Sequence, residues 1–160
     1  MIITLIQTTI FVVYITFLLI KFKRPLPSIS DSWYKLKPFH LQWIFTLVMY
    51  ALGSLMTFNG DSSSVWLFAS GMGLIFVGGA TQFLPRKGPV PIIHFTGAAI
   101  GIGAALLGLG IDYDAWYALS IFGGLSALFY IGALIWKWKD HIWWIEIIGV
   151  ISILIGLFTI

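Results

Sequence analysis

Apolar residues along the chain form six long runs, separated by short stretches that contain most of the polar side chains. The runs cover about 2–20, 41–58, 65–84, 91–110, 115–135 and 142–160. A helix that crosses a lipid bilayer needs about 20 mostly apolar residues. The pattern therefore predicts an all-α fold, a six-helix transmembrane bundle, in which residues 1–160 form a single integral membrane domain.

The fourth run has the narrowest face of all six. His94, Gly97, Gly101, Ala105 and Gly108 recur at steps of three and four, so they share one face of a helix. Small residues at this spacing let neighbouring membrane helices approach closely. We therefore expect this helix in the interior of the bundle, with His94 directed inward.

Composition supports a membrane location. The chain is 59% hydrophobic and only 9% charged, with a mean hydropathy of +0.99. So few polar residues cannot cover a soluble domain. The first run lacks a basic flank and a cleavage site, so we expect it to stay as a span. The chain has no cysteine, which excludes disulfides and thiol nucleophiles. These features predict a multi-pass protein of the cell membrane.

Charge is distributed unevenly between the two sides of the predicted bundle. The connections after the first, third and fifth runs contain all nine basic residues: Lys21, Lys23, Arg24, Lys35, Lys37, Arg86, Lys87, Lys137 and Lys139. The opposite connections contain Asp61, Asp112 and Asp114. By the positive-inside rule, the basic side is cytoplasmic and the N-terminus and C-terminus are outside. This rim suits anionic lipid headgroups, and the pattern gives no sign of nucleic-acid binding.

The connection after the first run contains a proline pair and a short helical signal. Pro25 and Pro27 stop the first helix and hold the chain extended. Ser30 then has the position of an N-cap for a short interfacial helix, with Trp33 and Tyr34 as membrane anchors.

Glu146 is the only acidic residue well inside an apolar run. An unpaired carboxylate at the centre of a membrane helix costs about 2.5–3.5 kcal/mol on insertion scales, so it needs a partner or a proton. His94 has a similar depth, and we expect the two to form a buried pair. Ser30 or Asp31 should lie close to it. The candidate catalytic residues are therefore His94, Glu146, Ser30 and Asp31.

Other interpretations of these polar residues stay open. His94 and Glu146 are also typical of residues that only fix helix packing, and His40 and His141 of residues at a membrane interface. Two facing histidines would be needed for haem. No His-x-x-x-His or Glu-x-x-His spacing indicates a metal site, and no nucleophile-elbow motif is present. We predict no metal and no cofactor.

The chain also contains an approximate internal repeat. His40 to Ala80 and His94 to Ala133 each run from a histidine through a span, an aspartate turn, a tryptophan and a glycine-rich span. Two hairpins in the same orientation are typical of duplicated transporter folds.

Three short motifs resemble those of a known superfamily. They are Pro27 to Asp31 followed by Tyr34, His94 to Ala98, and Trp144 with Glu146. The chain resembles the six-helix superfamily that includes the DRAM and Frag-type proteins and small uncharacterised bacterial relatives. The resemblance implies a role in lipid handling or remodelling, with Ser30, Asp31, His94 and Glu146 at the corresponding site. Those families place the serine-containing loop on the non-cytoplasmic side, whereas the lysines here place it inside.

Three functions remain after this reading. The first is a lipid-interacting protein or accessory subunit, whose polar layer binds a headgroup or a partner subunit, with homo-oligomers formed through exposed small-residue faces. The second is a membrane-embedded lipid-modifying enzyme, in which His94 is the general base and Glu146 orients it. The third is a transporter or channel built from the two hairpins. The sequence leaves open whether the protein is an enzyme.

Overall fold

The computed structural model describes residues 1–59, 64–80, 89–138 and 140–160. These ranges contain helices and no strand, so the prediction of an all-α fold is confirmed for them. The helices are α1 (Ile2–Phe22), α2 (Asp31–Leu36), the 3₁₀ turn η1 (Lys37–Phe39), α3 (Trp43–Asn59), α4 (Val65–Ala80), α5 (Pro89–Tyr113), α6 (Trp116–Trp136) and α7 (His141–Phe158). Four residues of the predicted charge pattern lie outside the described residues: Asp61, Arg86, Lys87 and Lys139.

Four of these helices are long and apolar enough to cross a membrane. They are Ile2–Phe22, Ile92–Tyr113, Trp116–Trp136 and His141–Phe158. Two further helices, α3 and α4, are apolar but shorter, with 17 and 16 residues. All six begin close to the predicted positions, and the described part of the chain has the character of a membrane protein.

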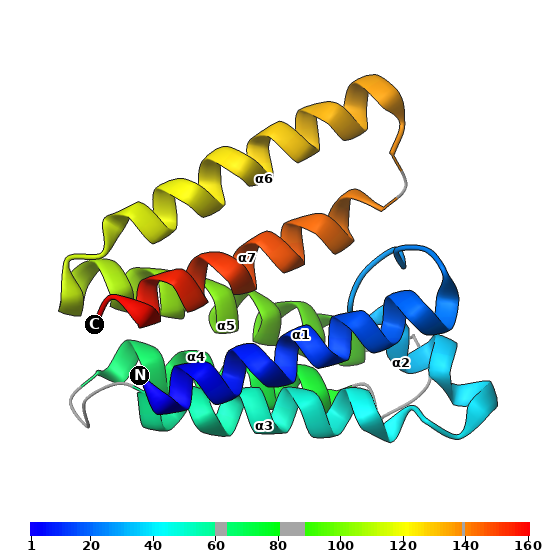
Figure 1. Ribbon diagram of the computed structural model, residues 1–160, viewed down its shortest axis with the longest axis horizontal. Coiled ribbons are helices and arrows are strands. Elements are labelled where there is room, and N and C mark those ends of the chain that lie inside the picture. Colours follow the sequence, from blue (N-terminus) through cyan, green and yellow to red (C-terminus); the bar gives the residue numbers. More distant parts are fainter. Residues whose placement is uncertain (60–63, 81–88, 139) are drawn as a thin grey trace.

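The long helices run along a common direction, and both termini lie at the same end of the molecule (Figure 1). α4 packs between α3 and α5, and α7 packs between α6 and the rest of the bundle. α6 diverges from α5 along its length, so that only two of its residues, Ala118 and Gly132, are buried. The two predicted hairpins, α3–α4 and α5–α6, therefore differ in how tightly their helices pack.

α1 packs against both α3 and α7, although it has no glycine with which to approach them closely. It achieves this through one buried face at helical spacing, and the face includes two polar residues that make hydrogen bonds there. The buried residues are Thr4, Gln7, Phe11, Tyr14 and Leu18.

α4 and α5 approach each other at backbone distance, as the small-residue face predicts. A Cβ atom added at Gly73 would lie 2.5 Å from the amide nitrogen of Gly101 and 2.7 Å from the carbonyl oxygen of Gly97. Backbone atoms therefore meet backbone atoms, and no side chain fits between them. This contact fixes the depth of α5 and hence the position of His94.

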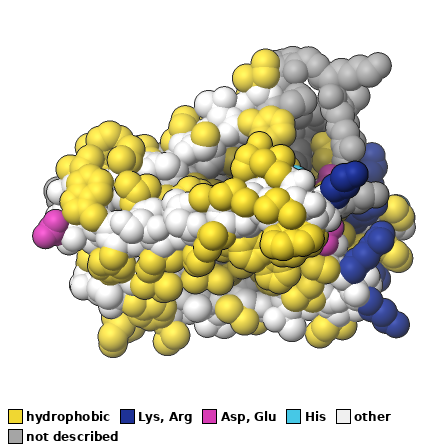
Figure 2. Space-filling model, turned by 90° about the horizontal axis from the view of Figure 1, so that it is seen from above, with side chains coloured by type: hydrophobic (Ala, Val, Ile, Leu, Met, Phe, Trp, Pro, Cys, Tyr) yellow, Lys and Arg dark blue, Asp and Glu magenta, His cyan; other side chains and the backbone are white. Residues whose placement is uncertain are grey.

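Basic side chains gather at one end of the bundle, whereas acidic side chains occur at both ends. Figure 2 shows lysine and arginine side chains gathered at the end where α1 finishes, and an acidic group at the opposite end. By their positions in the chain, Lys21, Lys23 and Arg24 lie where α1 ends, and Lys35 lies in α2. The fold therefore keeps the polarity of basic charge that the sequence predicts.

Replacement of Gly73 by alanine should separate α4 from α5. Because the new methyl group meets backbone rather than a movable side chain, we expect a loss of about 1–3 kcal/mol in the free energy of unfolding. The matched control is Gly103→Ala in α5, where a Cβ atom meets nothing within 4 Å. Denaturation in detergent, followed by circular dichroism, should find the control as stable as the parent. Equal stability of the two variants would contradict the close contact.

Candidate functional site

The chain between α1 and α2 turns back over the end of the bundle. Pro25 and Pro27 precede the turn, and α2 starts at Asp31. Ser30 occupies the N-cap position, as predicted, but its side chain makes no capping bond. Instead, the Asp31 amide donates to Oγ of Ser28, at 3.1 Å, and Ser28 Oγ lies 3.0 Å from Ser30 Oγ. Ser28 therefore caps the helix, which relieves the Ser30 hydroxyl of that role.

The short helix α2 packs into the hydrophobic core of the bundle with one face. The hydroxyl groups of Tyr14 and Ser32 are 2.5 Å apart, and Ser32 is fully buried. Trp33 is only 6% exposed, so its predicted role as a membrane anchor is wrong. Its ring packs with the hydrophobic cluster that includes Leu36, because α2 turns this face toward the bundle. The segment before α2 is thereby fixed in place.

Glu146 joins that segment to α7. Its carboxylate accepts a hydrogen bond from the backbone N–H of Ile29, across 117 positions in sequence. A buried carboxylate needs donors to replace the water that it loses, and a main-chain N–H provides one. The sequence led us to expect a side chain on another helix as the partner of Glu146. The partner is instead the backbone of the loop between α1 and α2.

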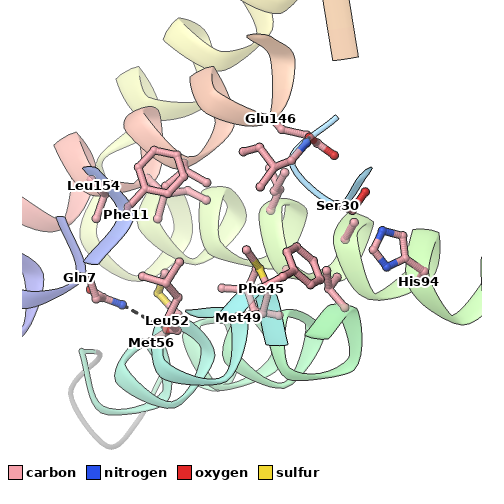
Figure 3. Close-up of a pocket in the computed structure, with 18 residues that line it drawn as sticks. Gln7, Phe11, Ser30, Phe45, Met49, Leu52, Met56, His94, Glu146 and Leu154 are labelled. Atoms are coloured by element: carbon pink, nitrogen blue, oxygen red, sulfur yellow. Dashed lines mark hydrogen bonds between the residues drawn. The ribbon is translucent and has the colours of Figure 1, made fainter. Parts of the chain in front are cut away.

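These elements enclose a cavity of about 90 Å³ lined by eighteen residues (Figure 3). Its walls are mainly apolar and come from α1, α3, α4, α5 and α7. They include Phe11, Phe45, Met49, Leu52 and Leu154. The polar residues among those that line it are Gln7, Ser30, His94 and Glu146.

The polar residues are divided between the two ends of the cavity. Figure 3 shows Glu146, Ser30 and His94 at one end and Gln7 at the other, with Phe11, Met49 and Leu52 among the side chains between them. The cavity is thus elongated, with a polar group of three residues and an apolar middle. We call the three residues Ser30, His94 and Glu146 the polar end of the cavity.

His94 contributes a buried acceptor to the polar end. The ring has a hydrogen bond with the backbone of Val77, while Nδ1 is buried and has no partner among the residues that the structure describes. A neutral imidazole that donates from one nitrogen accepts at the other. Nδ1 is therefore available as an acceptor.

Three of the four predicted site residues come together, but not in the predicted way. Ser30, His94 and Glu146 line one cavity, whereas Asp31 does not line it and lies close enough to Glu146 for an electrostatic effect. No hydrogen bond or ion pair joins His94 to Glu146 within the described ranges. The direct pair is therefore a wrong expectation, because the Ile29 N–H takes its place.

The other two histidines lie away from this cavity. His40 is exposed in a left-handed backbone conformation just after η1, and His141 begins α7, with Nδ1 2.8 Å from the Trp138 carbonyl oxygen. Among the described residues, no three His, Asp or Glu side chains gather as ligands for a metal ion. These two positions fit the interfacial interpretation.

The sequence reasoning missed the polar network at the far end of the cavity. Gln7 donates to the Leu52 carbonyl at 3.5 Å and accepts from Nδ2 of Asn59 at 2.7 Å. Asn59 in turn accepts from Oγ1 of Thr4, at 3.2 Å. The sequence does contain an indication of this network, because the polar residues Thr4 and Gln7 stand three positions apart, on one helix face, within an apolar run. This network closes the cavity on the side opposite to Glu146.

Two exposed lysines, one at the end of α1 and one just after α2, lie over aromatic rings. The Lys21 ammonium is 3.8 Å from the ring centroid of Phe39, and that of Lys37 is 5.7 Å from the ring centroid of Trp33. Both lysines are exposed. Cations in this position are attracted to the ring faces. Their charge therefore stays outside the cavity.

No family model, curated protein or solved structure matches the chain. The features of the molecule that bear on function are the cavity, its polar end and the apolar helices that surround it.

The Glu146–Ile29 hydrogen bond predicts a difference between two neutral replacements. Glu146→Gln keeps an acceptor oxygen, while Glu146→Leu leaves the Ile29 N–H without one. An unsatisfied buried donor costs about 1–3 kcal/mol, so the leucine variant should be less stable than the glutamine variant by that amount. Because both variants remove the same charge, thermal unfolding of the pair isolates the hydrogen bond. Equal stability would show that the bond does not hold the loop.

Proposed function

We propose that this chain is a six-crossing membrane protein that binds a membrane amphiphile. A short apolar section of the ligand occupies the elongated cavity, and the headgroup lies at the polar end. The observation that carries this proposal is the cavity itself, with its apolar walls and with Ser30, His94 and Glu146 together at one end. Ligand sites are typically concave and apolar, with a few polar groups that fix orientation.

The six crossings include α3 and α4. At 1.5 Å per residue the 17 residues of α3 extend about 25 Å, against a hydrocarbon thickness of about 30 Å. A local thinning of the bilayer accommodates such a difference at modest cost. The tight packing of α4 between α3 and α5 supports a common depth for all three helices. The termini are then outside and the lysine-rich end is cytoplasmic.

The size of the cavity favours a slim ligand. An apolar cavity of about 150 Å³ in another protein takes up benzene, so about 90 Å³ holds only a short section of an alkyl chain. Its aliphatic and aromatic walls give no partners to water in the middle section. This property supports an amphiphile more than an ion or a polar solute, and so it favours lipid binding over the transporter alternative.

The enzyme alternative keeps the same three residues but needs a different geometry. A general base must lie within hydrogen-bond reach of the proton that it removes. Ser30 Oγ has its hydrogen bond with Ser28, and His94 Nδ1 has no partner in the described part of the chain. The arrangement therefore supports binding. The lipid remodelling implied by the resemblance to DRAM and Frag-type proteins stays a prediction.

One face of α6 supports a second role, as a subunit that binds a partner helix or a second copy. Gly123 and Gly124 are exposed, and a Cβ atom added at either meets nothing within 4 Å. Exposed small residues on a membrane helix are typical of surfaces that pack against another helix. This observation favours the accessory-subunit form of the proposal.

The absence of cysteine makes the proposed topology directly testable. Single-cysteine variants at Val65 and Ile160, which are both exposed, should react with a membrane-impermeant maleimide on intact cells. Variants at Lys23 and Lys35 should react only after the membrane is permeabilised. Labelling of Val65→Cys from the cytoplasmic side would show that the α3–α4 hairpin does not cross as proposed.

Two neighbouring alanines in α5 provide a matched test of the binding cavity. Ala98 lines the cavity, whereas Ala99 is exposed on the outer face of the same helix. Because Ala98→Leu fills part of the cavity, the variant should lose the lipid that copurifies with the parent protein, as measured by native mass spectrometry. Ala99→Leu should retain it.

Gel filtration and thermal unfolding serve as controls for the fold of both variants. Equal lipid retention by two folded variants would contradict binding in the cavity.

A further inference from the structure

Among the residues that the structure describes, those at the polar end of the cavity present acceptors and no charged donor. Glu146 offers carboxylate oxygens, Ser30 a hydroxyl oxygen and His94 the lone pair of Nδ1. A carboxylate has about four lone-pair sites, so the single bond from the Ile29 N–H leaves capacity for further donors. The three side chains come from different elements, yet Figure 3 shows them at the same end.

Near the polar end of the cavity, the charged groups in the interior are carboxylates and those on the exposed surface are lysines. Asp31 adds a second carboxylate close to Glu146. The exposed ammonium groups of Lys21 and Lys37 lie over the rings of Phe39 and Trp33, outside the cavity and on either side of the loop that contains Ser30 in the sequence. A ligand that crosses this boundary therefore meets carboxylate in the cavity and cations outside it.

We propose that the polar end selects a primary ammonium group, an inference that rests on the proposed function. The amphiphile is then a phospholipid with an ethanolamine-type headgroup. A primary ammonium has three N–H donors and one positive charge, which match three acceptors and the charge of Glu146. The phosphate of the same headgroup then lies toward the lysine-rich end of the bundle. A short section of one acyl chain occupies the apolar part of the cavity, and the rest of the lipid extends outside it.

The number of N–H donors is the variable that tests this inference. Phosphatidylethanolamine, its N-methyl and N,N-dimethyl derivatives and phosphatidylcholine carry the same charge and, with matched acyl chains, differ in N–H count from three to none. Each lipid is added to the protein in nanodiscs of phosphatidylglycerol, and binding is measured by native mass spectrometry. Affinity should fall along the series. Phosphatidylcholine should bind at least about tenfold more weakly than phosphatidylethanolamine, as expected for lost charge-assisted hydrogen bonds.

Substitutions at two carboxylates locate the selectivity. Glu146→Gln should reduce the difference between phosphatidylethanolamine and phosphatidylcholine several-fold. The matched control is Asp114→Asn, at the opposite end of the bundle and exposed, where asparagine tolerates the positive φ of that position. The control should leave the difference unchanged.

The outcomes separate this inference from the function on which it rests. If all four lipids bind equally well and Ala98→Leu abolishes their binding, the cavity binds lipid but the selection of a primary ammonium is wrong. The inference is also overturned if Glu146→Gln keeps the full preference. If Ala98→Leu and Ala99→Leu bind every lipid as the parent does, the cavity is not the site, and both proposals fail.

Discussion

The hydrogen bond between the Glu146 carboxylate and the Ile29 amide is the interaction on which the rest of this site depends. It joins α7 to the loop between α1 and α2, and so brings together residues that the sequence separates by more than a hundred positions. A carboxylate in an apolar surrounding costs free energy unless a donor reaches it. The loop provides that donor, and the same contact places Ser30 beside the cavity. This one hydrogen bond thus explains both how a carboxylate is accommodated among apolar helices and where the site lies.

The opposite wall of the cavity depends on packing between small residues. Gly73 of α4 meets Gly97 and Gly101 of α5 at backbone distance, which leaves α5 no freedom to shift. His94 lies one turn before Gly97 and is therefore held at the level of Ser30. The close contact and the cavity adjoin on α5, because Gly101 belongs to both. Rigid helices with a cavity between them are a suitable arrangement for a ligand that must be oriented without a large movement of the protein.

Much of the fold follows from residue type and spacing, but the partners of the polar residues do not. The apolar runs predict where α1 and α3 to α7 lie, and the spacing of Gly97, Gly101 and Gly108 predicts the inward face of α5. Glu146 and His94 were recognised because a polar group inside an apolar run needs an explanation. Their separate partners, the backbone at Ile29 and Val77, could not be predicted, because main-chain donors and acceptors leave no mark in the sequence. Gln7 was overlooked for a related reason: its partners, Asn59 and Leu52, are brought to it only by the packing of α1 against α3.

The protein thus combines a bundle of apolar helices with an elongated cavity that has a polar end. The central proposal is that an amphiphile occupies this cavity, with its headgroup at Ser30, His94 and Glu146. The most direct measurement is a cryo-electron microscopy structure of the protein extracted with native lipid. This proposal predicts continuous density in the cavity, with a polar group within hydrogen-bond distance of Glu146 and a tail directed toward Gln7. A cavity without density, together with ordered lipid only on the outer surface of the bundle, would contradict it.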